Sequence, residues 1–399
     1  MSPIQAANAL EVCTKNDPAS TKVDRKSGSS AILCFLLSIP GVVLLLLFVV
    51  ASPGRVSDFA GFLVGVKLLG TARIYDVVAN LACQKALVGE SNPGVIFVRL
   101  PFWAFAMKPF LQLPYDHALF LWRVLLGAIL ITCAAISGQN RRYFFLALSW
   151  SVAAAGSVHT GNDAPVVLFF MLISLTFWRK ECPVLAGAAL GLCLAKFHFL
   201  IFLPLLLFRR ECRQELKGFL LAAAGLMAVN FVVQPDWLRL YWQALHLPQK
   251  NMNPWAAFMP NIYSTFFWTG HPGIAVALGA LIVLALLWPI CRRVPFDFAM
   301  PLCIFGALLA SPHTNYLDGI LAIPAILGAS SRFPQVRPLG IFLLSPVVGL
   351  LSFLGPPTIG PAIILAASLT LLGVTLRFTS GRGEYIRVTP CLAKEARRA

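Results

Sequence analysis

The feature that most constrains the fold is a succession of long apolar segments separated by short loops that carry basic residues. The first such segment, Ala31 to Ala51, contains no charged residue and would extend about 30 Å as a helix, enough to cross a bilayer. The tail before it carries four cations, Lys15, Lys22, Arg25 and Lys26. Because cytoplasmic flanks are enriched in Lys and Arg, this pattern predicts a cytoplasmic tail and a membrane-crossing chain.

The composition excludes a soluble globule. Of the 399 residues 58% are apolar and 12% charged, and the mean hydropathy is +0.78. The net charge of +16 comes from short basic groups between apolar segments, which is typical of topological signals and not of a nucleic-acid patch. The polar first 30 residues lead into the apolar run without a clear small-residue cleavage site, which predicts a retained anchor.

Cysteine spacing and nucleotide motifs exclude several further classes. With ten cysteines but only Cys83 in a predicted outer loop, we expect no disulfide framework. The chain has no CxxC or Cys/His spacing for zinc, no P-loop, no GxGxxG after a strand and no Asp-x-Asp motif. We therefore expect no metal or cofactor and no soluble nucleotide ligand.

The apolar segments predict twelve crossings of an all-α integral membrane bundle. They lie near 31–51, 117–137, 143–159, 164–178, 184–195, 198–208, 218–233, 273–290, 298–312, 319–330, 338–354 and 360–376. The basic pairs between them then fall in the cytoplasm, as do both termini. The predicted organisation is a tail, 1–30, a membrane domain, 31–377, with outer loops 52–116 and 234–272, and a basic tail, 378–399.

Two segments depend on this charge argument. Residues 94–113 are apolar but contain Arg99, Pro101, Lys108 and Pro109, and a crossing there would turn every later basic pair outward. We therefore predict an interfacial or re-entrant helix on the outer face. Residues 183–208 have basic groups on both sides, so the number of crossings must be even. They predict a short helical hairpin with Lys196 and His198 at its tip.

Candidate chemistry concentrates on the predicted outer face. All six histidines lie in or next to the outer half, and Asp58 follows the first span by a few residues. A carboxylate shared by lipid and water can act as a base, although a solvated interfacial carboxylate is the simpler alternative. The tryptophans of the second outer loop are equally consistent with an interfacial aromatic belt and with a sugar- or lipid-binding role.

An outer location also restricts the donor of a transferase. Because nucleotide sugars are not supplied outside a membrane, the sugar would be carried on a lipid phosphate. Such a reaction needs one base for the acceptor hydroxyl and cations for the departing phosphate. The second pKa of a phosphate monoester is about 6, so it leaves without a dedicated acid, and one carboxylate suffices where a glycosidase needs two.

Four motifs carry a resemblance to a known family. The chain resembles the polyprenyl-phosphate-dependent glycosyltransferases of family 87, in the GT-C superfamily, at Ser57-Asp58-Phe59, at GTARIYD (70–76), at LAGAALGLCLAK (185–196) and at LASPHTNYLD (309–318). The resemblance implies a GT-C-type helical bundle with juxtamembrane helices in the first outer loop, and an acidic catalytic base there, which maps onto Asp58. The chain departs from the family's Tyr-Pro-Pro-like stretch at residues 97–101 and from its Gly-Gln pair at residues 161–163.

Three cations are candidates for holding the donor phosphate, each with a simpler alternative. Lys196 is either a snorkelling side chain or a phosphate ligand, and its outer position breaks the positive-inside pattern. His313 is either a helix-capping residue or part of the site. Arg99 is either a lipid-headgroup anchor or a phosphate ligand. We expect three further residues to support them: His198 at the hairpin tip, and Asp76 and Asp318 as partners of the cations.

The resulting hypothesis is an inverting, metal-independent glycosyltransferase in the cell membrane. It would move mannose or another hexose or pentose from a polyprenyl phosphate to a hydroxyl of a lipid-linked or glycan acceptor on the outer face. The expected partners are these substrates and membrane lipids, not nucleic acid. The alternatives are a twelve-span secondary transporter, although no internal repeat is visible, and a lipid- or polyisoprenoid-binding protein without catalysis.

The loop charges generate a topology prediction. Reporter fusions after Arg142, Lys180, Arg213, Arg293 and Arg337 should report the cytoplasm, and fusions near Asp58, Asn253 and His313 should report the outside. A cytoplasmic signal from the Asn253 fusion would place residues 234–272 in the cytoplasm. It would then contradict the assignment of the candidate site residues to the outer face.

Overall fold

The chain is helical throughout the part that the structure describes. The computed structural model describes residues 23–50, 57–138, 141–245, 260–266, 271–354 and 359–381. Across these ranges the secondary structure consists of α-helices and 3₁₀-helices (η), with no strand. The prediction of an all-α protein is therefore confirmed for these residues. The first 22 residues of the predicted tail, the tail beyond 381 and much of the outer loop 234–272 lie outside them.

The helices follow one another in two groups along the chain. The first group is α2 (Val23–Val50), α3 (Asp58–Leu68), α4 (Val77–Val88), η1 (Pro93–Val95), α5 (Pro101–Met107), η2 (Lys108–Gln112), α6 (Tyr115–Ile136), α7 (Arg141–Ser149), α8 (Val152–Thr160) and α9 (Ala164–Arg179). The second is α10 (Pro183–Leu192), η4 (Cys193–Leu200), α11 (Pro204–Leu207), η5 (Arg210–Cys212), α12 (Arg213–Val233), α13 (Trp237–Leu245), α15 (Ile262–Phe266), α16 (Pro272–Arg293), α17 (Phe296–Ala310), η8 (Tyr316–Ala322), α18 (Ile323–Arg332), η9 (Pro334–Val336), α19 (Arg337–Leu344), α20 (Pro346–Leu354) and α21 (Ile359–Gly381).

Several helices are long and apolar enough to cross a bilayer. Within the described ranges there are five, Tyr115–Ile136, Pro183–Leu200, Arg210–Val233, Gly273–Arg293 and Ile359–Ser380. The pair α8 and α9 meets the same criteria together, with a bend of 120°, which raises the number to six. The chain is therefore a multi-pass helical membrane protein. The larger total of twelve crossings stays a prediction.

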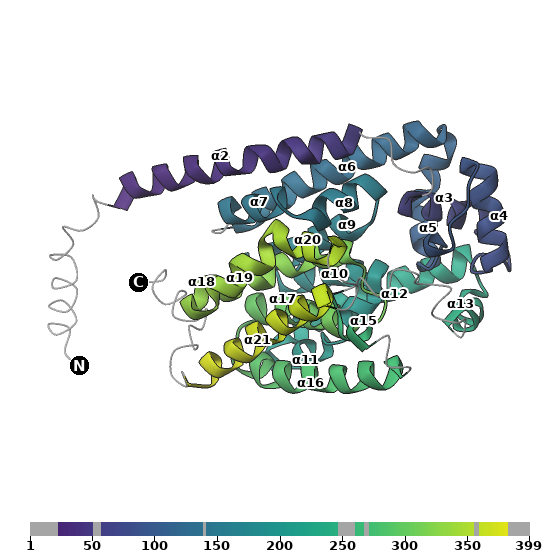
Figure 1. The fold of residues 1–399 in the computed structure, drawn as a ribbon. Helices are drawn as coiled ribbons and strands as arrows, with labels where there is room; N and C mark the ends of the chain where they lie inside the picture. The colour runs from purple at the N-terminus through teal and green to yellow at the C-terminus, as the bar shows by residue number, and fades with distance from the viewer. Residues whose placement is uncertain are drawn as a thin grey trace, which may run out of the picture.

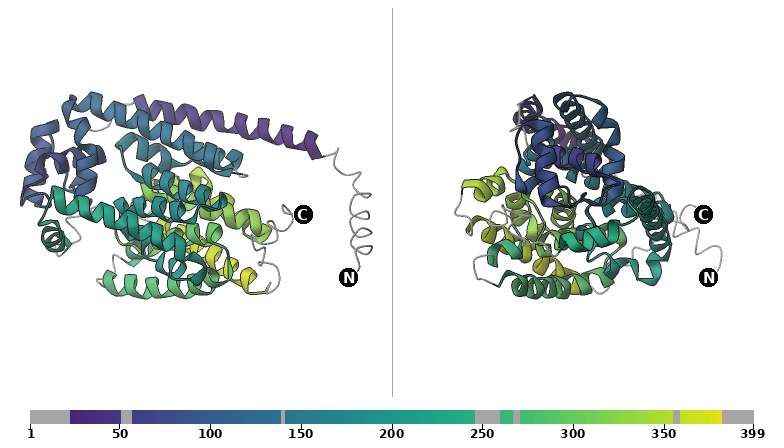
Figure 2. Two further views of the ribbon diagram at one scale, coloured as in Figure 1. Left: turned by 180° about the vertical axis from the view of Figure 1, so that it is seen from behind. Right: turned by 90° about the vertical axis from the view of Figure 1, so that its right-hand side faces the viewer.

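The arrangement separates two ends of the molecule. In Figure 1 the short helices α3, α4, α5 and α13 gather at one end, while the start of α2 and the end of α21 lie toward the opposite end. The reversed view in Figure 2 shows the same separation. Helices α3, α4 and α5 lie within the predicted first outer loop, where short helices were expected, and α13 lies within the second. Their position beside a membrane stays a prediction. Which end faces the cytoplasm remains a prediction from the loop charges.

The structure divides three predicted segments into shorter helices. Residues 143–159 break between α7 and α8, where the Ser151 hydroxyl accepts a hydrogen bond from the backbone N–H of Ala154 (3.1 Å) and caps α8. Residues 338–354 break at Ser345, before Pro346, which has no N–H to continue the helix. Residues 94–113 form parts of η1, α5 and η2, so the single helix predicted there is wrong. Two prolines, Pro101 and Pro109, begin or interrupt these pieces.

The segment 183–208 was predicted as a helical hairpin with Lys196 and His198 at its tip, and the structure breaks the helix at Lys196. The second arm contains only the four-residue helix α11, and Pro183–Leu200 is a single candidate span, so two crossings in this segment stay a prediction. Helix α10 continues into η4, where the backbone of Lys196 leaves the helical conformation (φ −127°, ψ 62°). The break directs the side chain of Lys196 inward, where it is only 2% exposed. The break is buried in protein, which is the condition under which a broken helix is tolerated in a membrane protein.

Glycines set the distance between α10 and α12. A Cβ atom on Gly187 would lie 1.8 Å from the carbonyl oxygen of Glu215, and one on Gly218 would lie 1.9 Å from that of Val184. Small residues allow helices in a membrane to approach this closely and gain van der Waals contact. This glycine seam holds α10, and with it the break at Lys196, against α12.

Candidate functional site

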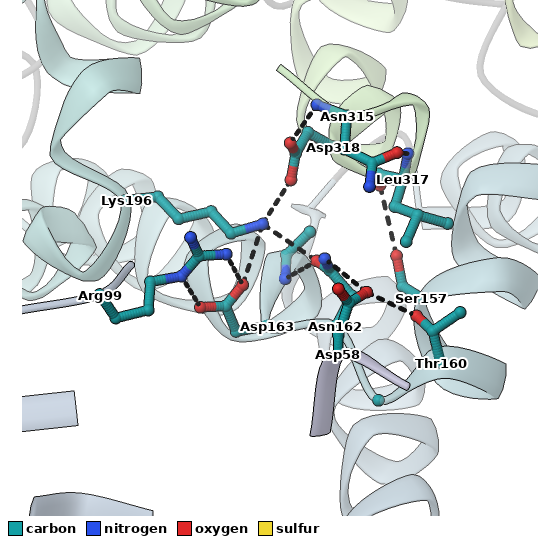
Figure 3. Close-up of polar contacts among 12 residues, drawn as sticks. Asp58, Arg99, Ser157, Thr160, Asn162, Asp163, Lys196, Asn315, Leu317 and Asp318 are labelled. Atoms are coloured by element: carbon teal, nitrogen blue, oxygen red, sulfur yellow. Dashed lines mark hydrogen bonds and ion pairs between the residues drawn. The ribbon is translucent and has the colours of Figure 1, made fainter. Parts of the chain in front are cut away.

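A cavity of about 250 Å³ lies between α3, η4, α13 and the loops that precede α5 and η8. Six of the seven site residues predicted from the sequence line it: Asp58, Arg99, Lys196, His198, His313 and Asp318. The fold therefore brings together side chains from the first outer loop, the break in η4 and the turn after α17. Figure 3 shows the polar contacts that four of them, Asp58, Arg99, Lys196 and Asp318, make with one another or with their neighbours.

Asp76 is the predicted residue that lies elsewhere. Its carboxylate accepts a hydrogen bond from the backbone N–H of Ala79 (2.6 Å) and caps α4. It also pairs with Arg73 at 3.6 Å, with both side chains exposed. Asp76 therefore pairs with Arg73 and with none of the cations in the cavity, so the prediction that it supports those cations is wrong. Its role in the structure is to begin α4.

The corner between α8 and α9 supplies polar groups to the cavity. Gly161 makes the corner with φ 72°, and a Cβ atom there would lie 2.8 Å from the Cβ of Phe59. Both observations require glycine. The corner leaves Thr160, Asn162 and Asp163 at the junction of the two helices, with Asn162 3% and Asp163 0% exposed.

The Lys196 ammonium makes three contacts with this corner and with η8. Its Nζ lies 2.9 Å from Oδ1 of Asn162 and 2.9 Å from Oδ1 of Asp163, and it also contacts Oδ1 of Asp318. An ammonium has three N–H donors, so these contacts use all of them. Burying such a charge is favourable only when it is paired and hydrogen-bonded, as it is here.

Arg99 forms the second ion pair of the network. Its Nε donates to Oδ2 of Asp163 (2.8 Å) and its Nη2 to Oδ1 (3.0 Å), a bidentate pair. Burial lowers the pKa of Arg99, but the charge and hydrogen bonds of Asp163 outweigh burial and hold that pKa above its ordinary value. Arg99 therefore stays cationic. We call Arg99, Asp163, Lys196 and Asp318 the four-charge network.

Asp318 connects the network to the start of η8. Its Oδ2 accepts a hydrogen bond from the backbone N–H of Asn315 (2.8 Å), while the Asn315 side chain accepts one from the backbone of Leu317 (3.4 Å). This reciprocal capping fixes the first turn of η8. The carboxylate therefore both orders the turn and neutralises Lys196.

Asp58 begins α3 and presents one oxygen to the corner. Its Oδ2 accepts hydrogen bonds from Thr160 Oγ1 (2.9 Å) and Asn162 Nδ2 (3.1 Å). Its Oδ1, by contrast, has no hydrogen-bond partner among the described residues. Burial raises the pKa of Asp58 above its ordinary value, and the two hydrogen bonds and the charges of Lys196 and Arg99 act in the opposite direction. A carboxylate with a raised pKa is a stronger base.

Two histidines complete the cavity wall. The rings of His198 and His313 lie 6.4 Å apart, centre to centre. Burial, and then the positive charge of Arg99, lower the pKa of His313 below its ordinary value, so its imidazole is neutral near pH 7. The Nε2 atom of His198 is buried without a hydrogen-bond partner in the described chain. His313 therefore offers a hydrogen bond to a ligand, not a full charge, and His198 has one ring nitrogen without a partner among the described residues.

The sequence interpretation missed three polar residues of the site. Asn162 and Asp163 were recognised as part of a departure from a family pattern, Thr160 was not recognised, and Asp163 is the centre of the network. The available signal was a glycine flanked by polar residues between two apolar segments, Thr160 to Asp163. It identifies a corner, although its contacts with Asp58 and Lys196 depend on the tertiary fold.

Comparison with family models identifies one match. The model for glycosyltransferase family 87 matches residues 97–312, more than half of the 399-residue chain. The matched range contains Arg99, the α8–α9 corner and Lys196, and it ends one residue before His313. Asp58 lies before it. Comparison with curated proteins and with solved structures yields no match.

The network generates a prediction for stability. Asp163→Asn removes the carboxylate that Arg99 and Lys196 share, leaving the two buried cations with Asp318 alone. We expect a loss of about 3–5 kcal/mol in the free energy of unfolding, the scale for breaking a buried ion pair, measured as a fall in thermal midpoint in detergent. Asp236→Asn is the matched control, because its partner Arg239 lies 3.5 Å away and both are exposed. Equal midpoints for the two variants would contradict the prediction.

Proposed function

The chain belongs to glycosyltransferase family 87, and we propose that this multi-pass membrane glycosyltransferase takes its sugar from a polyprenyl phosphate. The acceptor is a hydroxyl of a lipid-linked or glycan substrate, and the site faces the outside of the cell membrane, with both chain termini in the cytoplasm. The twelve-span topology and the orientation come from the loop charges. The sugar is mannose or another hexose or pentose.

The observation that carries the mechanism is the asymmetric environment of Asp58. Thr160 and Asn162 hold Oδ2, so the carboxylate has one orientation, and Oδ1 is left for a substrate. In the proposed reaction Oδ1 accepts the proton of the acceptor hydroxyl. The hydroxyl oxygen then attacks the anomeric carbon, and the bond between that carbon and the phosphate oxygen breaks. The phosphate leaves with the electron pair, so the anomeric centre inverts.

The charges in the cavity indicate how the leaving phosphate is stabilised. Arg99 and Lys196 are balanced by Asp163 and Asp318, so the network offers no excess positive charge. The phosphate must therefore be held by directed hydrogen bonds. The N–H groups of Arg99 that Asp163 does not use, together with the neutral imidazole of His313, are the donors we propose, with His198 beside them.

Lys196 takes a more specific role than the sequence suggested. A direct bond from Lys196 to the phosphate requires the exchange of one of its three present contacts. In the contacts described above, its charge instead acts through Asn162, whose Oδ1 accepts from Lys196 while its Nδ2 donates to Asp58. No metal or cofactor takes part in the proposed reaction, because a phosphate monoester is already a good leaving group near neutral pH.

Replacing the base tests the proposal directly. Asp58→Asn preserves the size of the side chain but cannot take up a full proton, so the rate of transfer from a radiolabelled polyprenyl-phosphate sugar should fall by about 100-fold or more. Donor affinity should survive. Asp76→Asn is the control, because this carboxylate caps a helix outside the cavity and should leave the rate unchanged. Transfer at the wild-type rate by Asp58→Asn would reject Asp58 as the base.

Replacing phosphate donors should give a different signature. His313→Ala removes a hydrogen bond to the phosphate that strengthens as the phosphate departs, so it should lower kcat and raise the donor KM. Lys196→Ala removes a charge that acts on Asp58 through Asn162, so it should lower kcat with a smaller effect on the donor KM. Lys196→Ala also leaves Asp318 without a cationic partner and Asp163 with Arg99 alone, so its thermal midpoint must be measured beside its rate. A change in kcat alone for His313→Ala would remove it from the phosphate contacts.

The hydrogen bonds to Asp58 generate a prediction for pH dependence. Thr160→Val keeps the shape of the side chain but removes a bond that lowers the pKa of Asp58, so that pKa should rise. The acidic limb of the kcat profile should then move to higher pH, with near-normal rates on the alkaline side. Ser157→Ala is the matched control on α8, because Ser157 bonds the carbonyls of Ala153 and Leu317 and not Asp58.

The other titratable groups near Asp58 do not obscure this measurement. Arg99 stays cationic, and burial followed by the charge of Asp58 raises the pKa of Tyr316 to about 12. Tyr115 and Lys196 also lie near, and neither contacts Thr160 in the described structure. His313 titrates on the acidic side, but Thr160→Val does not touch it. If the acidic limb of the kcat profile lies at the same pH in Thr160→Val as in the unmodified protein, the titrating group is not Asp58.

A further inference from the structure

Helix α13 begins immediately after a candidate membrane span. The span Arg210–Val233 ends only a few residues before α13 (Trp237–Leu245). The corner between them is fixed by Gln234, whose side chain accepts from the backbone N–H of Gly70 (2.7 Å) and donates to the carbonyl of Thr71 (3.1 Å). A helix held at the end of a span lies at the level of the membrane surface.

The side chains of α13 divide its surface into three sectors. Successive residues are rotated by about 100° around a helix, so positions four and seven apart share a face. Trp237, Leu240 and Ala244 form the sector packed on the protein. The exposed polar sector contains Arg239 and Gln243.

The third sector of α13 is apolar and exposed. Leu238 is 58%, Trp242 64% and Leu245 41% exposed. These three residues recur at the spacing of one helical face. Apolar side chains are stable in this position only when they leave water. We call Leu238, Trp242 and Leu245 the outer face of α13.

Tyr241 and Leu245 connect this face to the site. Both line the cavity that contains Asp58. The Tyr241 ring packs edge-on against Tyr75 (5.2 Å between ring centres), and the Tyr75 hydroxyl donates to the carbonyl of Arg99 (3.0 Å). One edge of α13 is therefore a wall of the cavity, and the adjacent sector is the outer face.

We propose that the outer face of α13 inserts into the lipid surface at the mouth of the cavity. The partner is the membrane itself, because the face adjoins a candidate span, contains a tryptophan of the kind enriched at membrane surfaces, and is bordered by a polar sector suited to water. Lipid then forms the edge of the cavity beside Tyr241 and Leu245. A lipid-borne substrate reaches Asp58 from the membrane plane, without passing through water.

Tryptophan fluorescence tests the insertion without any assay of transfer. The protein is reconstituted in phosphatidylcholine vesicles whose acyl chains carry bromine, a quencher confined to lipid, and iodide serves as the quencher confined to water. The emission of Trp242 is the difference between the emission of the unmodified protein and that of Trp242→Phe. Bromine should quench this emission severalfold more than iodide does. Trp237→Phe is the matched control on the same helix, because Trp237 is 7% exposed and packs on Phe231.

Each alternative outcome overturns the insertion. If iodide and not bromine quenches the Trp242 emission, the outer face lies in water. If neither quencher reaches it, a protein surface, such as a second copy of this chain, covers the face. Both replacements are aromatic for aromatic, and the thermal midpoint of each variant confirms that α13 keeps its place.

A second measurement tests the access route and rests on the proposed function. Leu238→Asp places a charge on the outer face, whereas Gln243→Asp places the same charge on the polar sector. With a long-chain donor in vesicles, Leu238→Asp should raise the KM severalfold and Gln243→Asp should not. With a short-chain, water-soluble donor the two variants should have the same KM. Equal KM values on the long-chain donor would overturn the route, and no transfer by the unmodified protein would instead overturn the proposed function.

Discussion

The ion pairs centred on Asp163 are the interaction on which the rest of the site depends. They join four separate segments: the first outer loop through Arg99, the α8–α9 corner, the break in η4 through Lys196, and the start of η8 through Asp318. Each segment lies between helices or at a break in one, where polar groups are left to satisfy. The ion pairs hold the four segments together, and Asn162, which accepts from Lys196 and donates to Asp58, links them to the base.

The charge balance of this network matches the proposed chemistry. Before reaction, one negative charge resides on Asp58 and one on the donor phosphodiester. When the hydroxyl proton moves to Asp58, that carboxyl becomes neutral while the departing phosphate gains a negative charge. The total charge of the cavity is therefore unchanged, and a surrounding network that is already neutral has nothing to compensate. Only the location of the charge moves, from the α3 side of the cavity toward Arg99 and His313.

Much of this site could be predicted from the sequence, because the predicted membrane topology indicates which reactive side chains lie on the same face. Loop charges assigned Asp58, Lys196 and His313 to one face, and the fold brings them to one cavity. The predictions failed where local geometry decides: residues 94–113 contain prolines that divide an apolar run into short helices, and Asp76 caps α4 instead of joining the site. Asp163 was missed as a central residue because its burial follows from the bend at Gly161, and a sequence pattern does not give the direction of a bend.

The glycine seam between α10 and α12 has a mechanical consequence. Only 11% of the apolar window of the candidate span Arg210–Val233 is buried inside the protein, so the seam is one of the few places where this helix packs closely on a neighbour. One side of the seam is continuous with the break at Lys196, and the other with the corner at Gln234 that carries α13. Thickening the seam by a single methyl group would wedge the two helices apart. The displacement would move both walls of the cavity, so a change of one methyl group at the seam would alter the shape of a site that it does not touch.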